Sequence, residues 1–185
     1  MLDVTQVMVQ EHRLILRMVA LVDANAARAE QGVFQDWAFF LDAVDFIRTY
    51  ADRFHHAKEE DVLFVELVNN GMPAKRSPIE AMLIEHDHGR AFVGALESAA
   101  TAALAGDESQ VPAIVFNGRG WAALLTDHIH KEDTILYPLA ERVLPAAVRP
   151  RMVASYQAAA GDGTLHVRYQ ALVERWEREA ATPVG

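Results

Sequence analysis

Apolar residues recur every three to four positions along most of this chain, which is the spacing of one face of an α-helix. The pattern predicts four long helices at about 3–30, 34–69, 78–105 and 111–144, and a fifth near 163–180. Glycine and proline clusters separate these segments, and no β-branched run bounded by hairpin turns predicts a strand. We therefore expect an all-α fold: an up-down-up-down four-helix bundle with an additional C-terminal helix.

The domain organisation follows from length and composition. A chain of 185 residues without a shift in composition favours a single domain over 1–185. We expect the core bundle to span about 3–145 and a C-terminal helical extension to span about 150–180.

Charge and cysteine content exclude several classes of function. The net charge is −9, from 17 basic and 26 acidic residues, so we expect no nucleic-acid partner. The absence of cysteine excludes disulfide scaffolds, thiolate metal sites and cysteine nucleophiles. The longest uncharged run, Ser109 to Gly118, is half of the ~20 residues that a membrane span needs. We expect a cytoplasmic protein with no signal peptide and no membrane partner, and a homo-oligomer stays an open alternative.

Histidine is the unusual component, with eight copies. A helical wheel places one histidine from each of the four long helices on the apolar face of its helix. Two of these helices add a glutamate one turn later, within about 40° of the histidine. The inward set consists of His12, His55, Glu59, His86, His128 and Glu132.

The other histidines lie off these apolar faces. The wheel predicts that His56, His88 and His130 are surface residues. His166 shares a face with Tyr169 and Trp176, which favours packing against the bundle over a role as a ligand.

Two carboxylates in an apolar core would each cost several kcal/mol if they had no partner. The inward faces carry few lysines or arginines that could neutralise them. A single inward histidine is typical of an ordinary core residue, but one on each of four helices favours a metal site. Imidazole and carboxylate together suit iron, manganese or zinc, and glutamates that can bridge favour two metal ions.

Four stretches of the chain resemble the hemerythrin family, and specifically its HHE cation-binding branch. They are QEHRLI around His12, FHHAKEEDVLF around His55, IEHDHGR around His86 and DHIHKEDTILYP around His128. Their order and spacing make the resemblance specific over about residues 3–145, and the fifth helix resembles the C-terminal extension of some bacterial members.

The resemblance implies a hemerythrin-like bundle that holds two non-haem iron ions, with manganese or zinc as substitutes. His12 and His55 would bind one iron ion. His86 and His128 would bind the other. Glu59 and Glu132 would bridge the two ions, and an oxo or hydroxo group would complete the centre.

Two positions depart from the oxygen-carrying hemerythrins. Those proteins have a fifth histidine one turn after the third-helix histidine, where this chain has Arg90. They also place an aspartate five residues after the fourth-helix histidine. Asp133 has that spacing here, whereas the wheel favours Glu132. Arg90 either reaches an open coordination position or pairs with Glu97 or Glu85.

The function that we expect is binding of O₂, or of a related small molecule such as NO or peroxide, for sensing, storage or detoxification. A di-iron enzyme that decomposes peroxide or reduces NO is the alternative, as is an iron storage or delivery protein. A ferritin-type oxidase fits less well, because Glu-x-x-His occurs only once, at Glu85 and His88. A bundle without any metal is the remaining alternative.

Overall fold

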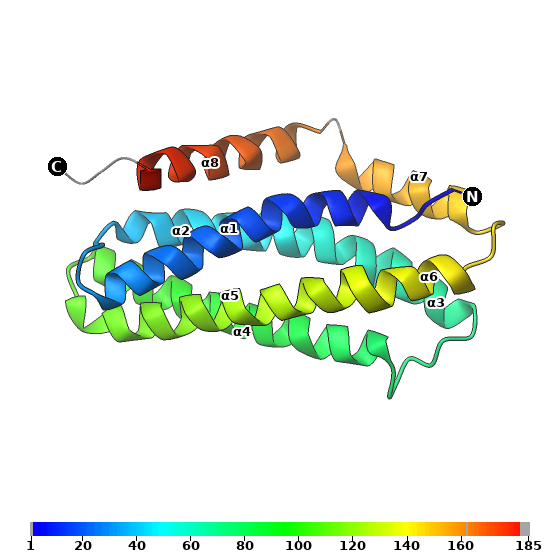
Figure 1. The fold of residues 1–185 in the computed structure, drawn as a ribbon, viewed down its shortest axis with the longest axis horizontal. Helices are drawn as coiled ribbons and strands as arrows, with labels where there is room; N and C mark the ends of the chain where they lie inside the picture. The colour runs from blue at the N-terminus through cyan, green and yellow to red at the C-terminus, as the bar shows by residue number, and fades with distance from the viewer. Residues whose placement is uncertain (1, 162, 182–185) are drawn as a thin grey trace.

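The computed structural model describes residues 2–161 and 163–181, and these form a long bundle of helices (Figure 1). Residues 1, 162 and 182–185, which the single-domain prediction over 1–185 includes, lie outside the described residues. No strand occurs among the residues that are described.

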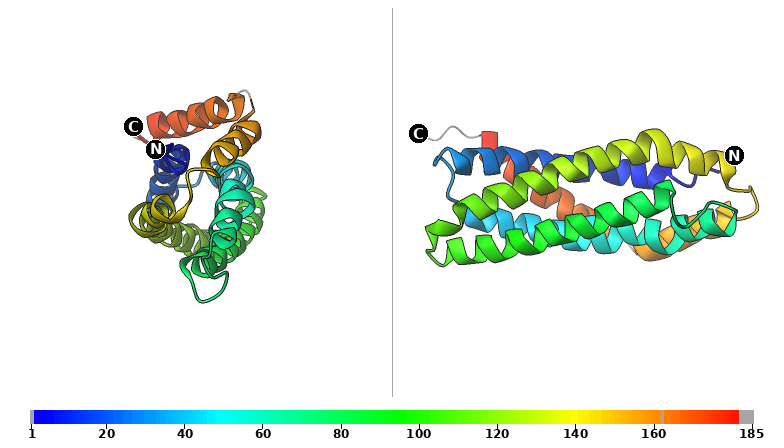
Figure 2. Two further views of the ribbon diagram at one scale, coloured as in Figure 1. Left: turned by 90° about the vertical axis from the view of Figure 1, so that its right-hand side faces the viewer. Right: turned by 90° about the horizontal axis from the view of Figure 1, so that it is seen from below.

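Four antiparallel helical rods make the bundle, which confirms the predicted all-α fold (Figures 1 and 2). Two of the rods are single helices, α1 (Gln6–Glu30) and α4 (Pro78–Leu104). The other two are interrupted by π-helical segments. The second rod consists of α2 (Trp37–Phe46), η1 (Ile47–His56), η2 (Glu59–Leu63) and α3 (Phe64–Asn69). After the short 3-10 turn η3 (Glu108–Gln110), the fourth rod consists of α5 (Val111–Lys131), η4 (Glu132–Leu136) and α6 (Tyr137–Val143).

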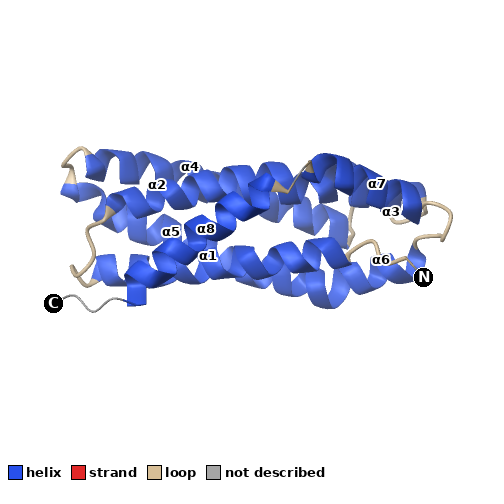
Figure 3. Cartoon of the chain, turned by 90° about the horizontal axis from the view of Figure 1, so that it is seen from above, coloured by secondary structure: helices blue, strands red, loops and turns tan. Residues whose placement is uncertain are grey.

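The C-terminal extension contains two helices where the sequence predicts one. They are α7 (Arg149–Ala160) and α8 (Thr164–Ala181). Prolines 145 and 150 suggest an irregular segment, but Pro150 occupies the first turn of α7, where its missing N–H costs no intrahelical hydrogen bond. Helix α8 lies along the outside of the bundle, over α1 and the second rod (Figure 3).

The buried apolar side chains form two clusters rather than one continuous core. The larger cluster includes Ile15, Phe40 and Trp121 and takes in Trp176 of α8. The smaller one surrounds Met8, Leu67 and Leu136 and is extended by side chains of α7. Along the rods, the inward histidines and glutamates lie between these two clusters. The bundle therefore has a polar layer between two apolar ones.

Arg149 links the C-terminal extension to the end of the bundle. Its side chain is 1% exposed, and it donates to the backbone oxygens of Leu2, Glu141 and Leu144. It also pairs with the Glu141 carboxylate, which accepts a hydrogen bond from the backbone N–H of Val4. One buried guanidinium thus joins the chain before α1, the end of α6 and the start of α7.

No helix among residues 2–161 and 163–181 combines the length and the apolar character needed to cross a lipid bilayer.

We predict that Arg149→Met lowers the free energy of unfolding by about 2–4 kcal/mol, because Glu141 and three carbonyl groups lose a buried donor. Chemical denaturation of the metal-free protein measures this loss. Arg151→Met is the matched control: its side chain is 64% exposed and pairs with Glu66, so the expected loss is below about 1 kcal/mol. Equal losses in the two variants would contradict the anchoring role of Arg149.

Candidate metal centre

The six side chains of the predicted inward set meet in the polar layer of the bundle. They come from all four rods, and each is at most 2% exposed. The residues brought together are His12, His55, Glu59, His86, His128 and Glu132.

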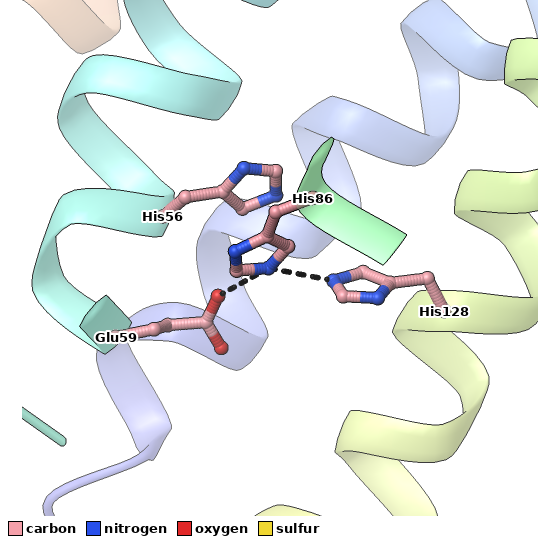
Figure 4. Close-up of side chains that lie close together, drawn as sticks. All are labelled: His56, Glu59, His86 and His128. Carbon is pink, nitrogen blue, oxygen red and sulfur yellow. Dashed lines mark hydrogen bonds and ion pairs between the residues drawn. The ribbon is translucent and has the colours of Figure 1, made fainter. Parts of the chain in front are cut away.

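The four imidazoles form two pairs whose Nε2 atoms face each other. The Nε2 atoms of His12 and His55 are 3.0 Å apart. Those of His86 and His128 are 3.2 Å apart, and a dashed line in Figure 4 marks this contact. Lone pairs that converge at this distance are arranged to share one proton or one cation.

Each of the two buried carboxylates contacts one histidine of each pair. Glu59 Oε2 lies 3.5 Å from His86 Nε2 and 3.9 Å from His55 Nε2. Glu132 places one oxygen 3.3 Å from His12 Nε2 and the other 3.1 Å from His128 Nε2. The two carboxylates therefore link the imidazole pairs.

The bonding of these carboxylates is incomplete without a cation. Glu59 Oε2 and both carboxylate oxygens of Glu132 are buried and find no hydrogen-bond partner within the described part of the chain. Native proteins rarely leave such atoms without a hydrogen bond, because no interaction then offsets the free-energy cost of their desolvation. A pair of cations bound by nitrogen and oxygen would satisfy all three atoms, so the residues present fit a metal centre.

Protonation in the metal-free protein follows from the same contacts. Burial and the neighbouring charge of Glu132 raise the pKa of Glu59 well above its ordinary value. Burial also disfavours the charge on Glu132, but the adjacent His128 and His12 lower its pKa well below the ordinary value. Burial opposes the charge on His12 too, yet Asp133 and Glu132 raise its pKa to about 9. One carboxylate is therefore ionised and the other is neutral until a cation offsets the burial of the second charge.

A second set of acids lies behind the imidazoles. The Nδ1 atom of each of the four histidines is within 3 Å of a carboxylate oxygen of the neighbouring rod. The pairs are Glu11 with His55 at 2.9 Å, Glu60 with His86 at 2.6 Å, Glu85 with His128 at 2.9 Å, and Asp133 with His12 at 2.8 Å. Such a partner fixes the ring and keeps the proton on Nδ1, which leaves the Nε2 lone pair for a metal.

The sequence reasoning did not find three of these four acids. Glu11 and Glu85 directly precede an inward histidine, and Glu60 directly follows an inward glutamate. Their adjacency to inward residues could have identified these acids. A helical wheel, however, places the residue next to an inward one about 100° away from the inward face. The outer acids contact the histidine of the next rod, so the wheel of a single helix cannot reveal them. Asp133, considered above as an alternative to Glu132, belongs to this outer set.

The prediction that His56 is a surface residue is wrong. Its residue exposure is only 9%, and its ring stacks on that of His86 with centroids 3.8 Å apart. The reason is local: η1 is π-helical, so successive residues turn through less than the 100° that the wheel assumes. His55 and His56 consequently both face the interior. His88 and His130 are exposed, as predicted.

Two further buried residues complete the surroundings of the site. The hydroxyl of Tyr137 donates to Glu59 Oε1 at 2.7 Å, and its ring stacks on His12. Lys58 is 2% exposed. Its ammonium binds Glu11 at 2.5 Å and therefore neutralises an outer acid, while the two central carboxylates remain without a lysine or arginine partner among the described residues.

Arg90 is a structural residue, but its predicted partners were wrong. It donates to Asp52 at 2.8 Å, to Glu60 at 2.7 Å and to Asp87 at 3.1 Å. Glu97 instead pairs with Arg48, and Glu85 with Lys131. Its guanidinium is thereby held against carboxylates of the second rod.

His166 packs against the bundle, in agreement with the favoured interpretation. Its Nδ1 lies 2.5 Å from the hydroxyl of Tyr50, and its side chain is half-buried.

A cavity of about 270 Å³ lies beside the His86–His128 pair. Its wall includes those two histidines together with His56, Arg90, Val93 and Trp121. A water molecule occupies about 30 Å³ in the liquid, so the cavity has room for molecules of a few atoms.

A comparison with protein families gives a match over most of the chain. The model of the hemerythrin HHE cation-binding domain matches residues 3–140, which include all six residues of the site. Neither a curated protein nor a solved structure matches the chain.

We predict that Glu85→Gln weakens metal binding by about 10–100-fold, because His128 loses the carboxylate that orients it. Anaerobic titration with ferrous ion measures the affinity. The control is Asp87→Asn on the same helix, whose side chain is 77% exposed and forms an ion pair only with Arg90 among the described residues. Unchanged affinity in Glu85→Gln would show that the outer acids do not support the site.

Proposed function

Because the chain belongs to the hemerythrin HHE cation-binding family, we propose that its polar layer holds two iron ions. In this proposal His12 and His55 bind one ion, and His86 and His128 bind the other. Glu59 and Glu132 bridge the two ions.

One observation carries the proposal: two pairs of converging imidazoles are linked by two carboxylates, each of which touches both pairs. A single ion would leave one pair and part of each carboxylate unused. Nitrogen and oxygen donors without sulfur suit iron, with manganese and zinc as the nearest alternatives.

We further propose that the centre binds O₂ or a related small molecule such as NO or peroxide. Two imidazoles and two carboxylate oxygens for each ion leave room for an external ligand. The cavity beside His86 and His128 supports access for a molecule of a few atoms. When bound, ferrous iron supplies the electron density that such a ligand accepts.

The protein side chains provide orientation and exclusion of water in this proposal. The outer acids hold the imidazole rings, and the hydroxyl of Tyr137 holds one oxygen of Glu59. The two apolar clusters on either side close the layer against solvent along the bundle axis.

Peroxide decomposition is the second candidate, and the size of the cavity favours it. A volume of about 270 Å³ exceeds what one diatomic molecule needs and would admit peroxide together with water. Arg90 lines this cavity, but its guanidinium is engaged by three carboxylates. This supports binding over Arg90-assisted turnover. Peroxide consumption that is lost in Arg90→Ala would reverse this preference.

The deciding measurement is the metal content and optical spectrum of protein purified without oxygen, before and after exposure to O₂ and NO. We expect two iron ions per chain and a ligand-to-iron charge-transfer band after exposure. Protein that contains two ferrous ions but develops no band with either gas would contradict small-molecule binding. Protein that takes up no metal would contradict the metal centre itself.

His86→Ala should lose much of the bound metal, because one imidazole pair is broken. His88→Ala, on an exposed position of the same helix, should retain two ions per chain. Elemental analysis of both purified variants measures the difference. Equal retention would overturn the assignment of His86 as a ligand.

Metal removal should lower the thermal stability, because ions that bind only the folded chain stabilise it by mass action. At a free metal concentration one hundred times the Kd, one site contributes about 2.7 kcal/mol. Calorimetry with ferrous ion and with a chelator should therefore give a higher Tm for the loaded protein. A Tm that does not respond to metal would contradict a site built into the folded core.

A further inference from the structure

His56 is a fifth imidazole beside the site, and the sequence pattern of one histidine per rod does not account for it. Its ring lies almost parallel to that of His86, with an interplanar angle of 11° (Figure 4). A ring nitrogen of His56 lies within 4.8 Å of a ligand atom of each of Glu59, His86 and His128. Rotation of the His56 side chain out of this stack would bring this nitrogen to an ion held by that pair.

The other side of the His56 ring repeats the arrangement of the four inward histidines. Its Nδ1 lies 3.4 Å from Asp52 Oδ1, one turn earlier on the same rod. The contact is longer than the other four, and this buried nitrogen makes no hydrogen bond with the residues that the structure describes. His56 thus has a carboxylate behind it, as each of the other inward histidines does.

Arg90 fixes the position of that carboxylate. Its guanidinium donates twice to Asp52 Oδ1, at 2.8 and 3.1 Å, and once to Glu60. Glu60 is the outer acid of His86, so one arginine holds the acids behind both stacked imidazoles.

We propose that His56 is a third imidazole ligand of the ion held by His86 and His128, a proposal that rests on the metal centre proposed above. The His86 side then has three imidazoles, and the His12 side has two. The two ions then differ in their number of imidazole ligands. His56 also lines the cavity, together with His86 and His128.

The direct test is a crystal structure of the metal-loaded wild-type protein. A His56 nitrogen at the usual metal–imidazole distance of about 2.1 Å would support the proposal. A separation greater than about 3 Å, with both ions present, would overturn it and leave the proposed metal centre intact. This test does not depend on any variant folding.

Anaerobic ferrous titration of His56→Gln supplies an independent readout. We expect one of the two ions to bind at least about tenfold more weakly and the other to keep its wild-type affinity, because only one ion loses a ligand. His130→Gln, an exposed position on α5, is the control and should bind both ions as the wild type does. Wild-type affinity at both sites in His56→Gln would make His56 a stacking partner only. Wild-type protein that binds no metal would overturn both proposals.

Discussion

Burying two carboxylates in the centre of an apolar bundle is the constraint on which the rest of this structure depends. Glu59 and Glu132 have no exposed surface, and three of their four oxygens make no hydrogen bond within the described residues. Everything around them reduces that cost: imidazoles converge on them, a tyrosine hydroxyl binds one oxygen, and a second set of acids orients the imidazoles. Because this polar layer lies in the middle of the bundle, the apolar core is divided into two clusters.

The π-helical segments occur where this layer requires them. Segments η1, η2 and η4 contain or begin at His55, Glu59 and Glu132, whereas α1 and α4, which each supply one inward histidine, are regular. A π-helical turn has more residues per turn, so it can direct adjacent side chains toward the same interior. The second and fourth rods each present an inner carboxylate and an outer one in consecutive positions, Glu59–Glu60 and Glu132–Asp133.

Periodicity was sufficient to predict the bundle and to bring six side chains together, because the inward face of a regular helix follows from spacing alone. It failed for His56, since the wheel assumed a uniform 100° per residue through a segment that is π-helical. It also could not assign partners across rods: the contacts of Arg90 and of the outer acids depend on how neighbouring helices are aligned. Helix α7 was missed because Pro150 signals a break in a sequence but is well tolerated in a first turn.

The outer acids form a closed circuit around the bundle. Glu11 of the first rod contacts His55 of the second, Glu60 of the second contacts His86 of the third, Glu85 of the third contacts His128 of the fourth, and Asp133 of the fourth returns to His12 of the first. Each rod supplies one acid to the next rod and has one histidine that contacts the acid of the preceding rod, always in the same direction around the bundle. The circuit therefore distinguishes this arrangement of rods from its mirror-ordered counterpart, in which every acid would face the wrong neighbour. The acids that orient the inward imidazoles therefore also specify the order of the four rods around the bundle.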